Sequence, residues 1–235
     1  MADDAPDSHI DHTASLRYWN SVDANINSML GGFPQVSRVD LRGSAAFLAR
    51  LRRLLPGIMP PAGTKLPRGV DCGAGIGRVT EGFLSQACEV VDVVEPVEKF
   101  ARVVREGPLK KEGKVGDVYV TGLESWVPEK KYDLIWNQWC VGHLTDAQLV
   151  EYLKRCKGAL TPSGVVVVKE NVSTGEDIYD ELDSSVTRTD HKFRALFRQA
   201  GMALVRTEEQ LGFPKSLGLF PVRFYALRPE PEDGR

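Results

Sequence analysis

The spacing of apolar residues changes in character near residue 68. Before this point, apolar positions recur at helical intervals in two stripes, from Leu16 to Leu30 and from Leu41 to Leu54. The glycine pair Gly31-Gly32 separates the two stripes, and a proline-rich segment from Pro56 to Pro67 follows the second one. The pattern therefore predicts a helical N-terminal part that ends in an irregular crossing segment.

After residue 68, short β-rich runs alternate with stretches of helical spacing. The predicted strands are Gly69–Cys72, Glu89–Val94, Val115–Val120, Tyr132–Trp139, Gly164–Lys169, Met202–Glu208 and Phe220–Leu227. The predicted helices are Arg78–Ala87, Val97–Glu106, Asp146–Leu160 and Thr189–Ala200. This alternation predicts an α/β fold with a mostly parallel, doubly wound sheet. Only Leu211–Leu219 separates the last two strands, which is too short for a crossover helix, so these strands are expected to be antiparallel.

The same pattern suggests how the chain is divided. Residues 1–67 are expected to form a helical extension, residues 68–228 the α/β core, and residues 229–235 a mobile tail. The polar residues 1–10 are expected to be a second mobile end. Since ligands of open α/β sheets bind at the carboxyl ends of the strands, we expect the extension to cover a site there.

Composition and charge narrow the classes of partner. The formal net charge of −2 gives no basic excess for binding nucleic acid or an anionic membrane surface, and no segment approaches the roughly 18 consecutive apolar residues of a membrane span. The N-terminus lacks the apolar run of a secretory signal. Four scattered cysteines without a CxxC spacing are read as buried free thiols rather than as zinc ligands or disulfides. A reducing compartment, cytoplasm or nucleus, is therefore expected, and no metal site.

The sharpest motif runs from Val70 to Thr80 and reads Val-Asp-Cys-Gly-Ala-Gly-Ile-Gly-Arg-Val-Thr. It follows a predicted strand and opens a predicted helix, where glycines permit a tight turn and the close approach of a ligand. The spacing is G-x-G-x-G, whereas a dinucleotide fingerprint would need its third glycine at Arg78. The motif therefore disfavours NAD.

Glu95 lies 18 residues after Gly77, at the end of the next predicted strand. An acidic side chain at this place can accept hydrogen bonds from both hydroxyls of a ribose. A glycine-rich turn alone could be an ordinary loop between a strand and a helix, but its combination with Glu95 indicates a nucleoside-containing cofactor.

Four segments together resemble the α-N-terminal protein methyltransferases. They are Asp-Cys-Gly-Ala-Gly-Ile-Gly-Arg at 71–78, Ile-Trp-Asn-Gln-Trp-Cys-Val-Gly-His-Leu-Thr-Asp at 135–146, Lys-Glu-Asn at 169–171 and Asp-Ser-Ser-Val-Thr-Arg at 183–188. The first is shared with many methyltransferases, whereas Gly-His-Leu-Thr-Asp and Asp-Ser-Ser-Val-x-Arg are far more selective. The resemblance extends from about Tyr18 to Arg228. It implies a class I, Rossmann-like methyltransferase fold with seven strands.

The resemblance also implies the reaction and the residues that perform it. Such enzymes transfer methyl groups from S-adenosylmethionine to proteins that begin X-Pro-Lys or X-Pro-Arg after removal of the initiator methionine. The implied cofactor residues are Gly73, Gly75, Arg78 at the cofactor carboxylate, Glu95, Leu123 and Glu124 at the adenine, and Gln138. The implied catalytic group comprises Asp183 and His143 beside the amine, and Asn171 anchoring the first residue of the substrate. The implied peptide channel comprises Trp19, Leu30, Gly31, Gly32 and Trp139, with Asp180 near the third residue of the substrate.

The chain departs from the family pattern at two of these positions. Glu95 stands where the family usually has aspartate, and Phe220 stands where it often has a tyrosine near the last strand. The second departure removes a possible hydrogen bond to the peptide.

Each catalytic candidate also has a plainer interpretation. His143 could merely support the start of the helix near Asp146, and Asp183 could be an Asx-turn or a helix cap. The acidic stretch from Asp177 to Asp183 could be a solvated face, and Trp19 could be an ordinary core residue. The residue types alone permit a cationic peptide site, and the resemblance is what favours one.

Two other functions remain open at this stage. A small-molecule amine methyltransferase on the same fold would methylate free amines and ignore X-Pro-Lys peptides. A catalytically silent scaffold would keep the fold without the cofactor, although the intact Gly73, Gly75, Gly77 and Glu95 argue against it. The chain is expected to be a monomer.

Overall fold

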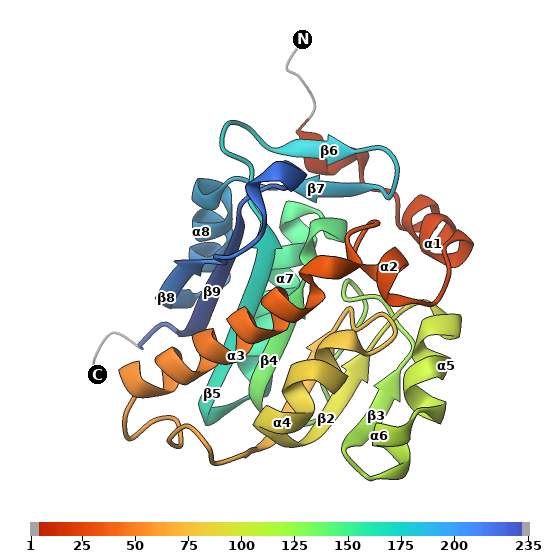
Figure 1. Cartoon of the computed structure of the whole chain (residues 1–235). Helices are drawn as coiled ribbons and strands as arrows, with labels where there is room; N and C mark the ends of the chain where they lie inside the picture. The colour runs from red at the N-terminus through yellow and green to blue at the C-terminus, as the bar shows by residue number, and fades with distance from the viewer. Residues whose placement is uncertain (1–4, 232–235) are drawn as a thin grey trace.

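The computed structural model describes residues 5–231, which form two sheets (Figure 1). The main sheet has seven strands in the order β3-β2-β1-β4-β5-β9-β8, and β6 pairs with β7 in a separate hairpin. The strands are β1 Leu66–Cys72, β2 Cys88–Val94, β3 Val115–Tyr119, β4 Tyr132–Gln138, β5 Leu160–Asn171, β6 Ile178–Asp180, β7 Ser185–Thr187, β8 Met202–Glu209 and β9 Val222–Pro229. The predicted α/β fold and its seven main strands are therefore confirmed.

The first five strands of the main sheet are parallel, and β9 pairs antiparallel with both β5 and β8. The expected antiparallel pair at the end of the chain is thus confirmed. Strand β4 stops at Gln138, one residue earlier than predicted, because Trp139 has a positive φ of 53° that does not fit an extended strand.

Helices cover both faces of the main sheet (Figure 1). They are α1 His12–Ser21, α2 Ile26–Met29, α3 Ser37–Leu54, α4 Ser85–Ala87, α5 Glu98–Glu106, α6 Pro108–Lys111, α7 Asp146–Ala159 and α8 Asp190–Gln199. The apolar residues of α7 and α8 pack on one face of the sheet, and those of α3 and α5 pack on the other. The predicted helix Arg78–Ala87 contains a π-helical turn at Thr80–Leu84, where Gly82 lets the side chain of Leu41 come close.

Helix α3 corrects the predicted boundary at residue 67. Phe47, Leu48 and Leu51 are buried against β1, β2, β4 and β9, and the ring of Phe47 stacks on Phe224 at a centroid distance of 4.5 Å. The helix is thus a layer of the α/β core rather than part of a covering extension. Only the segment before it, with α1 and α2, lies over the carboxyl edge of the sheet (Figure 1).

The structure describes only part of each chain end that was predicted to be mobile. Residues 6–9 form a 3₁₀-helix, and Asp11 donates its backbone N–H to Ser184 Oγ at 2.8 Å, so residues 6–10 are not a loose end. Strand β9 extends to Pro229, while residues 1–4 and 232–235 of the two predicted ends lie outside the described residues.

Two further sequence expectations concern the interior and the membrane. All four cysteines are free and buried, as the sequence predicts. Among the helices of residues 5–231, none has both the length and the apolar composition of a membrane span.

The stacking of Phe47 on Phe224 gives a first testable prediction. Phe47 is fully buried, so Phe47→Ala should lower the free energy of unfolding by about 3–5 kcal/mol through lost burial and the cavity left behind. Leu54→Ala on the same helix is the control, because Leu54 is 48% exposed and should change the value by only about 0.5 kcal/mol. Urea denaturation of both variants measures the difference, and equal losses would contradict the role assigned to α3.

Candidate active site

A pocket opens at the carboxyl ends of β1, β2 and β4. Its walls come from the loops that follow these strands and from α1. The lining residues are His12, Ser15, Leu16, Trp19, Met29, Gly73, Ala74, Gly75, Arg78, Val79, Glu95, Pro96, Val97, Phe100, Gly122, Leu123, Glu124, Gln138, Trp139, Cys140, His143 and Leu144. The parallel strands thus bring together residues from widely separated parts of the chain.

The glycine-rich turn forms the floor of this pocket. Gly73 has a φ of 65° and Gly75 a φ of 56°, a region that L-residues with a side chain rarely adopt. A Cβ atom at Gly73 would also lie 2.3 Å from Cys140 Cβ. Both glycines are therefore required by the backbone conformation, and Gly73 also by its close packing against the loop after β4.

Glu95 closes one side of the pocket at the end of β2. Its Oε2 accepts the N–H of Gly75 at 2.7 Å, and its Oε1 accepts the N–H of Val97 at 2.8 Å. Burial raises the pKa of Glu95 to about 7, against the lowering effect of these two hydrogen bonds. Each carboxylate oxygen keeps a second lone pair, so Glu95 can still accept hydrogen bonds from a diol.

Arg78 and Gln138 lie on another wall and share one partner. Arg78 Nη1 donates to Asp40 Oδ2 at 2.8 Å, and Gln138 Nε2 donates to both carboxylate oxygens of Asp40 at 2.9 Å. Gln138 Oε1 accepts from the indole N–H of Trp136 at 3.2 Å. These contacts fix the orientation of the amide, because its oxygen faces a donor and its nitrogen faces a carboxylate.

A histidine and a tryptophan line the far end of the pocket, and a carboxylate lies just outside the lining. His143 Nδ1 lies 3.1 Å from Ser15 Oγ, and His143 Nε2 lies 3.9 Å from Asp183 Oδ2. The ring of Trp19 meets the ring of His143 edge-on at 6.2 Å. Burial lowers the pKa of His143, although the negative charge of Asp183 acts in the opposite direction. The imidazole is therefore largely neutral near pH 7 and able to accept a proton.

The plainer interpretation of Asp183 as a cap is wrong. Asp183 Oδ1 is buried and has no hydrogen-bond partner among the described residues. The Asx-turn of this segment belongs to Asp180 instead, whose Oδ1 accepts the N–H of Leu182 at 2.9 Å. Asp177 is also structural, since its Oδ1 accepts the N–H of Thr189 at 2.8 Å. The acidic stretch is thus not a single solvated face.

The plainer interpretation of His143 is wrong as well. Thr145 and Gln148 cap helix α7 in a reciprocal capping box, so the histidine does not cap this helix. Buried Glu170 holds the preceding turn by accepting the N–H groups of Cys140 and Val141 at 2.7 and 2.9 Å. His143 therefore sits on a turn anchored from the core.

The structure brings together some predicted site residues and separates others. All seven predicted cofactor residues line the pocket, together with Trp19, Trp139 and His143. Asn171 ends β5 and pairs with Val222, while Leu30, Gly31, Gly32, Asp180 and Phe220 lie outside the pocket lining. Their proposed contacts with a peptide stay predictions.

Several lining residues escaped the sequence interpretation, including His12, Ser15 and Met29. Ser15 is a polar residue one position before Leu16 of the first stripe, and nothing local signals its contact with a histidine 128 positions away. Asp40 could have been found, because it lies 4, 7 and 8 positions before Ser44, Phe47 and Leu48 and so shares their buried face. Within residues 5–231, no group of three or more His, Cys, Asp or Glu residues is arranged to hold a metal ion.

The chain is similar to proteins of one known family over nearly its whole length. A family model described as AdoMet dependent proline di-methyltransferase matches residues 7–228. The chain belongs to this family. The alpha N-terminal protein methyltransferase 1 of Schizosaccharomyces pombe is 43% identical over 221 residues, covering 93% of this chain and 96% of that relative. The N-terminal Xaa-Pro-Lys N-methyltransferase 1 of Xenopus tropicalis is 38% identical, covering 90% of this chain and 92% of the relative.

Solved structures support the same assignment for this AdoMet-dependent methyltransferase. A SAM-dependent methyltransferase from Leishmania major superposes with a TM-score of 0.82 at 36% identity, covering 92% of this chain and 82% of that one. The 1,6-didemethyltoxoflavin-N1-methyltransferase of Burkholderia thailandensis has a TM-score of 0.68 at 18% identity, which shows the shared fold alone. The class I methyltransferase fold is therefore confirmed.

The raised pKa of Glu95 generates a prediction about the cofactor. Below about pH 7 the carboxyl becomes protonated and accepts hydrogen bonds from ribose hydroxyls less well. The affinity for S-adenosylhomocysteine should therefore fall about tenfold between pH 8 and pH 6. Calorimetric titration measures it, and Glu95→Gln should bind weakly with little dependence on pH.

A control is needed because His143 also lines the pocket. His143→Asn should keep the pH dependence of cofactor affinity if Glu95 causes it. An affinity of the parent protein that stays constant from pH 8 to pH 6 would contradict the assignment.

Proposed function

We propose that this protein transfers methyl groups from S-adenosylmethionine to the α-amino group of proteins that begin Xaa-Pro-Lys or Xaa-Pro-Arg. The observation that carries the proposal is a pair of residues: His143, at the far end of a pocket built on the glycine-rich turn and Glu95, and Asp183, which lies 3.9 Å from it just outside the pocket lining. The names of the relatives, N-terminal Xaa-Pro-Lys N-methyltransferase among them, support the same substrate class.

The pocket residues fit the proposed cofactor. Gly73 and Gly75 let a ligand approach the backbone, Glu95 can accept the two ribose hydroxyls, and Leu123 offers an apolar wall for a base. Only Nη1 of Arg78 makes a hydrogen bond within residues 5–231, so its other N–H groups are available to a carboxylate. When bound, S-adenosylmethionine supplies a methyl group on a positively charged sulfur.

The acceptor side needs an amine with a free lone pair. A protein α-amine has a reference pKa of about 7.7–8.0, so a useful fraction is already neutral near pH 7. The neutral imidazole of His143 can take the proton that the ammonium form carries, and Asp183 can hold the amine through its unpaired Oδ1. Orientation of the amine toward the cofactor contributes the larger share of the rate.

The surroundings of this pair suit the rest of the substrate. Trp19 and Trp139 give an aromatic wall of the kind that a proline ring packs against. The exposed Asp180 lies on β6, on the same hairpin as Asp183, where it can pair with a basic third residue. The monomeric state and a place in the cytoplasm or nucleus remain predictions from the sequence.

The charge of the third residue provides the test of the proposed function. A peptide beginning Ala-Pro-Lys should be methylated at its α-amine at least tenfold faster than its Ala-Pro-Glu counterpart, because Asp180 and Asp183 place negative charge on the hairpin beside the site. Mass spectrometry of both peptides after incubation with S-adenosylmethionine measures this. Added salt should reduce the preference, since Asp180 is exposed. Equal turnover of both peptides would favour a small-amine methyltransferase instead.

Asp183→Asn separates catalysis from cofactor binding. The variant keeps the shape of the side chain but loses its charge, so kcat at saturating peptide should fall on the order of 100-fold, and less at higher pH where more amine is neutral. Cofactor affinity should stay within about twofold, because Asp183 lies outside the pocket lining. Asp177→Asn on the same segment is the control, since Asp177 holds Thr189 and should leave kcat nearly unchanged. A parental kcat in Asp183→Asn would refute the catalytic assignment.

A further inference from the structure

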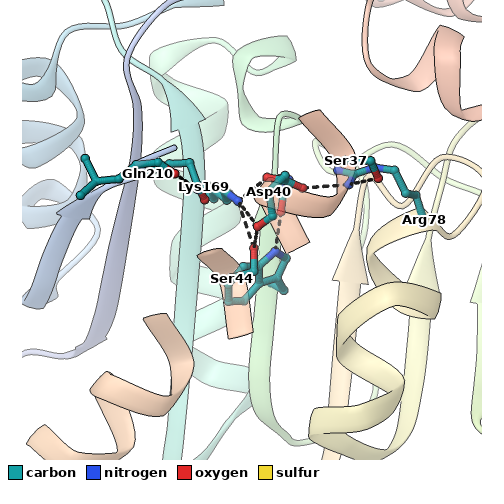
Figure 2. A network of polar contacts seen from close by, with 9 residues as sticks. Ser37, Asp40, Ser44, Arg78, Lys169 and Gln210 are labelled. Carbon is teal, nitrogen blue, oxygen red and sulfur yellow. Dashed lines mark hydrogen bonds and ion pairs between the residues drawn. The ribbon is translucent and has the colours of Figure 1, made fainter. Parts of the chain in front are cut away.

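A buried carboxylate on α3 connects three elements of the sheet behind the pocket. Asp40 is fully buried in the first turn and a half of α3, with Lys169 on one side and Arg78 on the other (Figure 2). Gln138 completes the set of partners. Arg78 opens the helix after the glycine-rich turn, Gln138 ends β4 and Lys169 lies near the end of β5, so a single side chain connects the segment after β1 with the ends of β4 and β5.

Lys169 fixes the position of this carboxylate. The ammonium group of Lys169 donates to Asp40 Oδ1, to the Asp40 carbonyl at 3.1 Å and to Ser44 Oγ at 3.0 Å. Its three hydrogens therefore all find acceptors on α3, and the side chain has no exposed surface. Lys169 itself does not line the pocket, and its side-chain hydrogen bonds all go to α3, although its ammonium group also lies 5.8 Å from the ring centroid of Trp139, which does line the pocket.

The anchored carboxylate in turn orients the two groups that face the pocket. Arg78 is 8% exposed, and Asp40 Oδ2 holds its Nη1 from the side of the core. The remaining N–H groups of Arg78 point away from that contact, and the residue lines the pocket. Because Lys169 shares the negative charge of Asp40, that charge does not fully satisfy Arg78, which can still bind another anion.

We propose that Asp40 is a positioning residue, which, held by Lys169, orients Arg78 and Gln138 to receive the carboxylate of the methyl donor. This inference rests on the proposed function, because it identifies that anion with the amino-acid end of S-adenosylmethionine. It assigns to α3 a part in cofactor recognition, although Asp40 itself does not touch the pocket.

The test compares two ligands that differ only at the end near Arg78. S-adenosylhomocysteine has the amino-acid chain with its carboxylate, whereas 5′-methylthioadenosine has the same nucleoside and thioether without that chain. Asp40→Asn combined with Lys169→Met removes one negative and one positive buried charge, so the interior keeps its charge balance while Arg78 loses its anchor. Calorimetry gives both affinities, and their ratio reports on the amino-acid chain that carries the carboxylate.

We expect the preference of the double variant for S-adenosylhomocysteine to fall at least tenfold, with the affinity for methylthioadenosine unchanged within about twofold. The control is Asp92→Asn, because Asp92 is an equally buried carboxylate that holds Arg68 away from the pocket. It should lower thermal stability and keep the ratio of the parent. If the double variant does not fold, the ratio is measured on Asp40→Asn with the same criteria.

Three other results would be decisive against the proposal. If the double variant keeps the affinity ratio of the parent, the positioning role of Asp40 is overturned, while the proposed function stands. If the double variant loses affinity for both ligands equally, Asp40 has a merely structural role, and the proposal is overturned as well. If the parent binds no S-adenosylhomocysteine, the proposed function fails first, and the inference that rests on it fails with it.

Discussion

The parallel strands β1, β2, β4 and β5 all end at one edge of the sheet, and the chemistry of the protein depends on that constraint. The chain order reverses between β1 and β4, so the loops after these two strands diverge to opposite faces and leave a crevice between them. Gly73, Glu95 and Gln138 each follow or end one of these strands. The three residues line one pocket because hydrogen-bonded register holds the strand ends level.

The same edge concentrates buried charge. Asp40 and Lys169 have no exposed surface, and Glu95 and Glu170 are buried with only 5% and 6% of their surface exposed. Burying these groups is costly, and each is paired or accepts backbone N–H groups in return. A site made in this way is rigid, since moving one group leaves another without a partner. Of the two residues other than glycine with positive φ among residues 5–231, Trp139 follows β4 at this edge, and Ser184 lies in the hairpin of β6 and β7.

The half of the site that would receive the substrate is built differently. The hairpin of β6 and β7 is separate from the main sheet, and the N-terminal segment packs against it through Asp11 and Ser184. His143 belongs to a core turn, whereas Asp183 belongs to this hairpin. The 3.9 Å between them therefore depends on how the hairpin sits on the sheet, while the cofactor half depends on the strands alone.

Much of the cofactor half could be predicted from local sequence. Glycines at fixed spacing after one strand and an acid after the next need only the α/β pattern to define a pocket. The family resemblance implied the other four cofactor residues, and all seven line the pocket. The pattern could not predict β6 and β7, because three-residue strands are too short to show a period. The pattern also assigned α3 to the N-terminal extension instead of the core, because helical spacing reveals an apolar face but not which element packs against it.

The sequence by itself determined the fold class, the succession of strands and helices along the chain and the turn that faces the cofactor, because each depends on residues that are neighbours along the chain. Only the tertiary structure decided which partners the buried polar groups have. Asp40 meets Lys169 across 129 positions, and Ser15 meets His143 across 128. The periodicity of apolar residues along the sequence does not reveal such contacts, because they depend on how helices and strands pack together rather than on how each one forms.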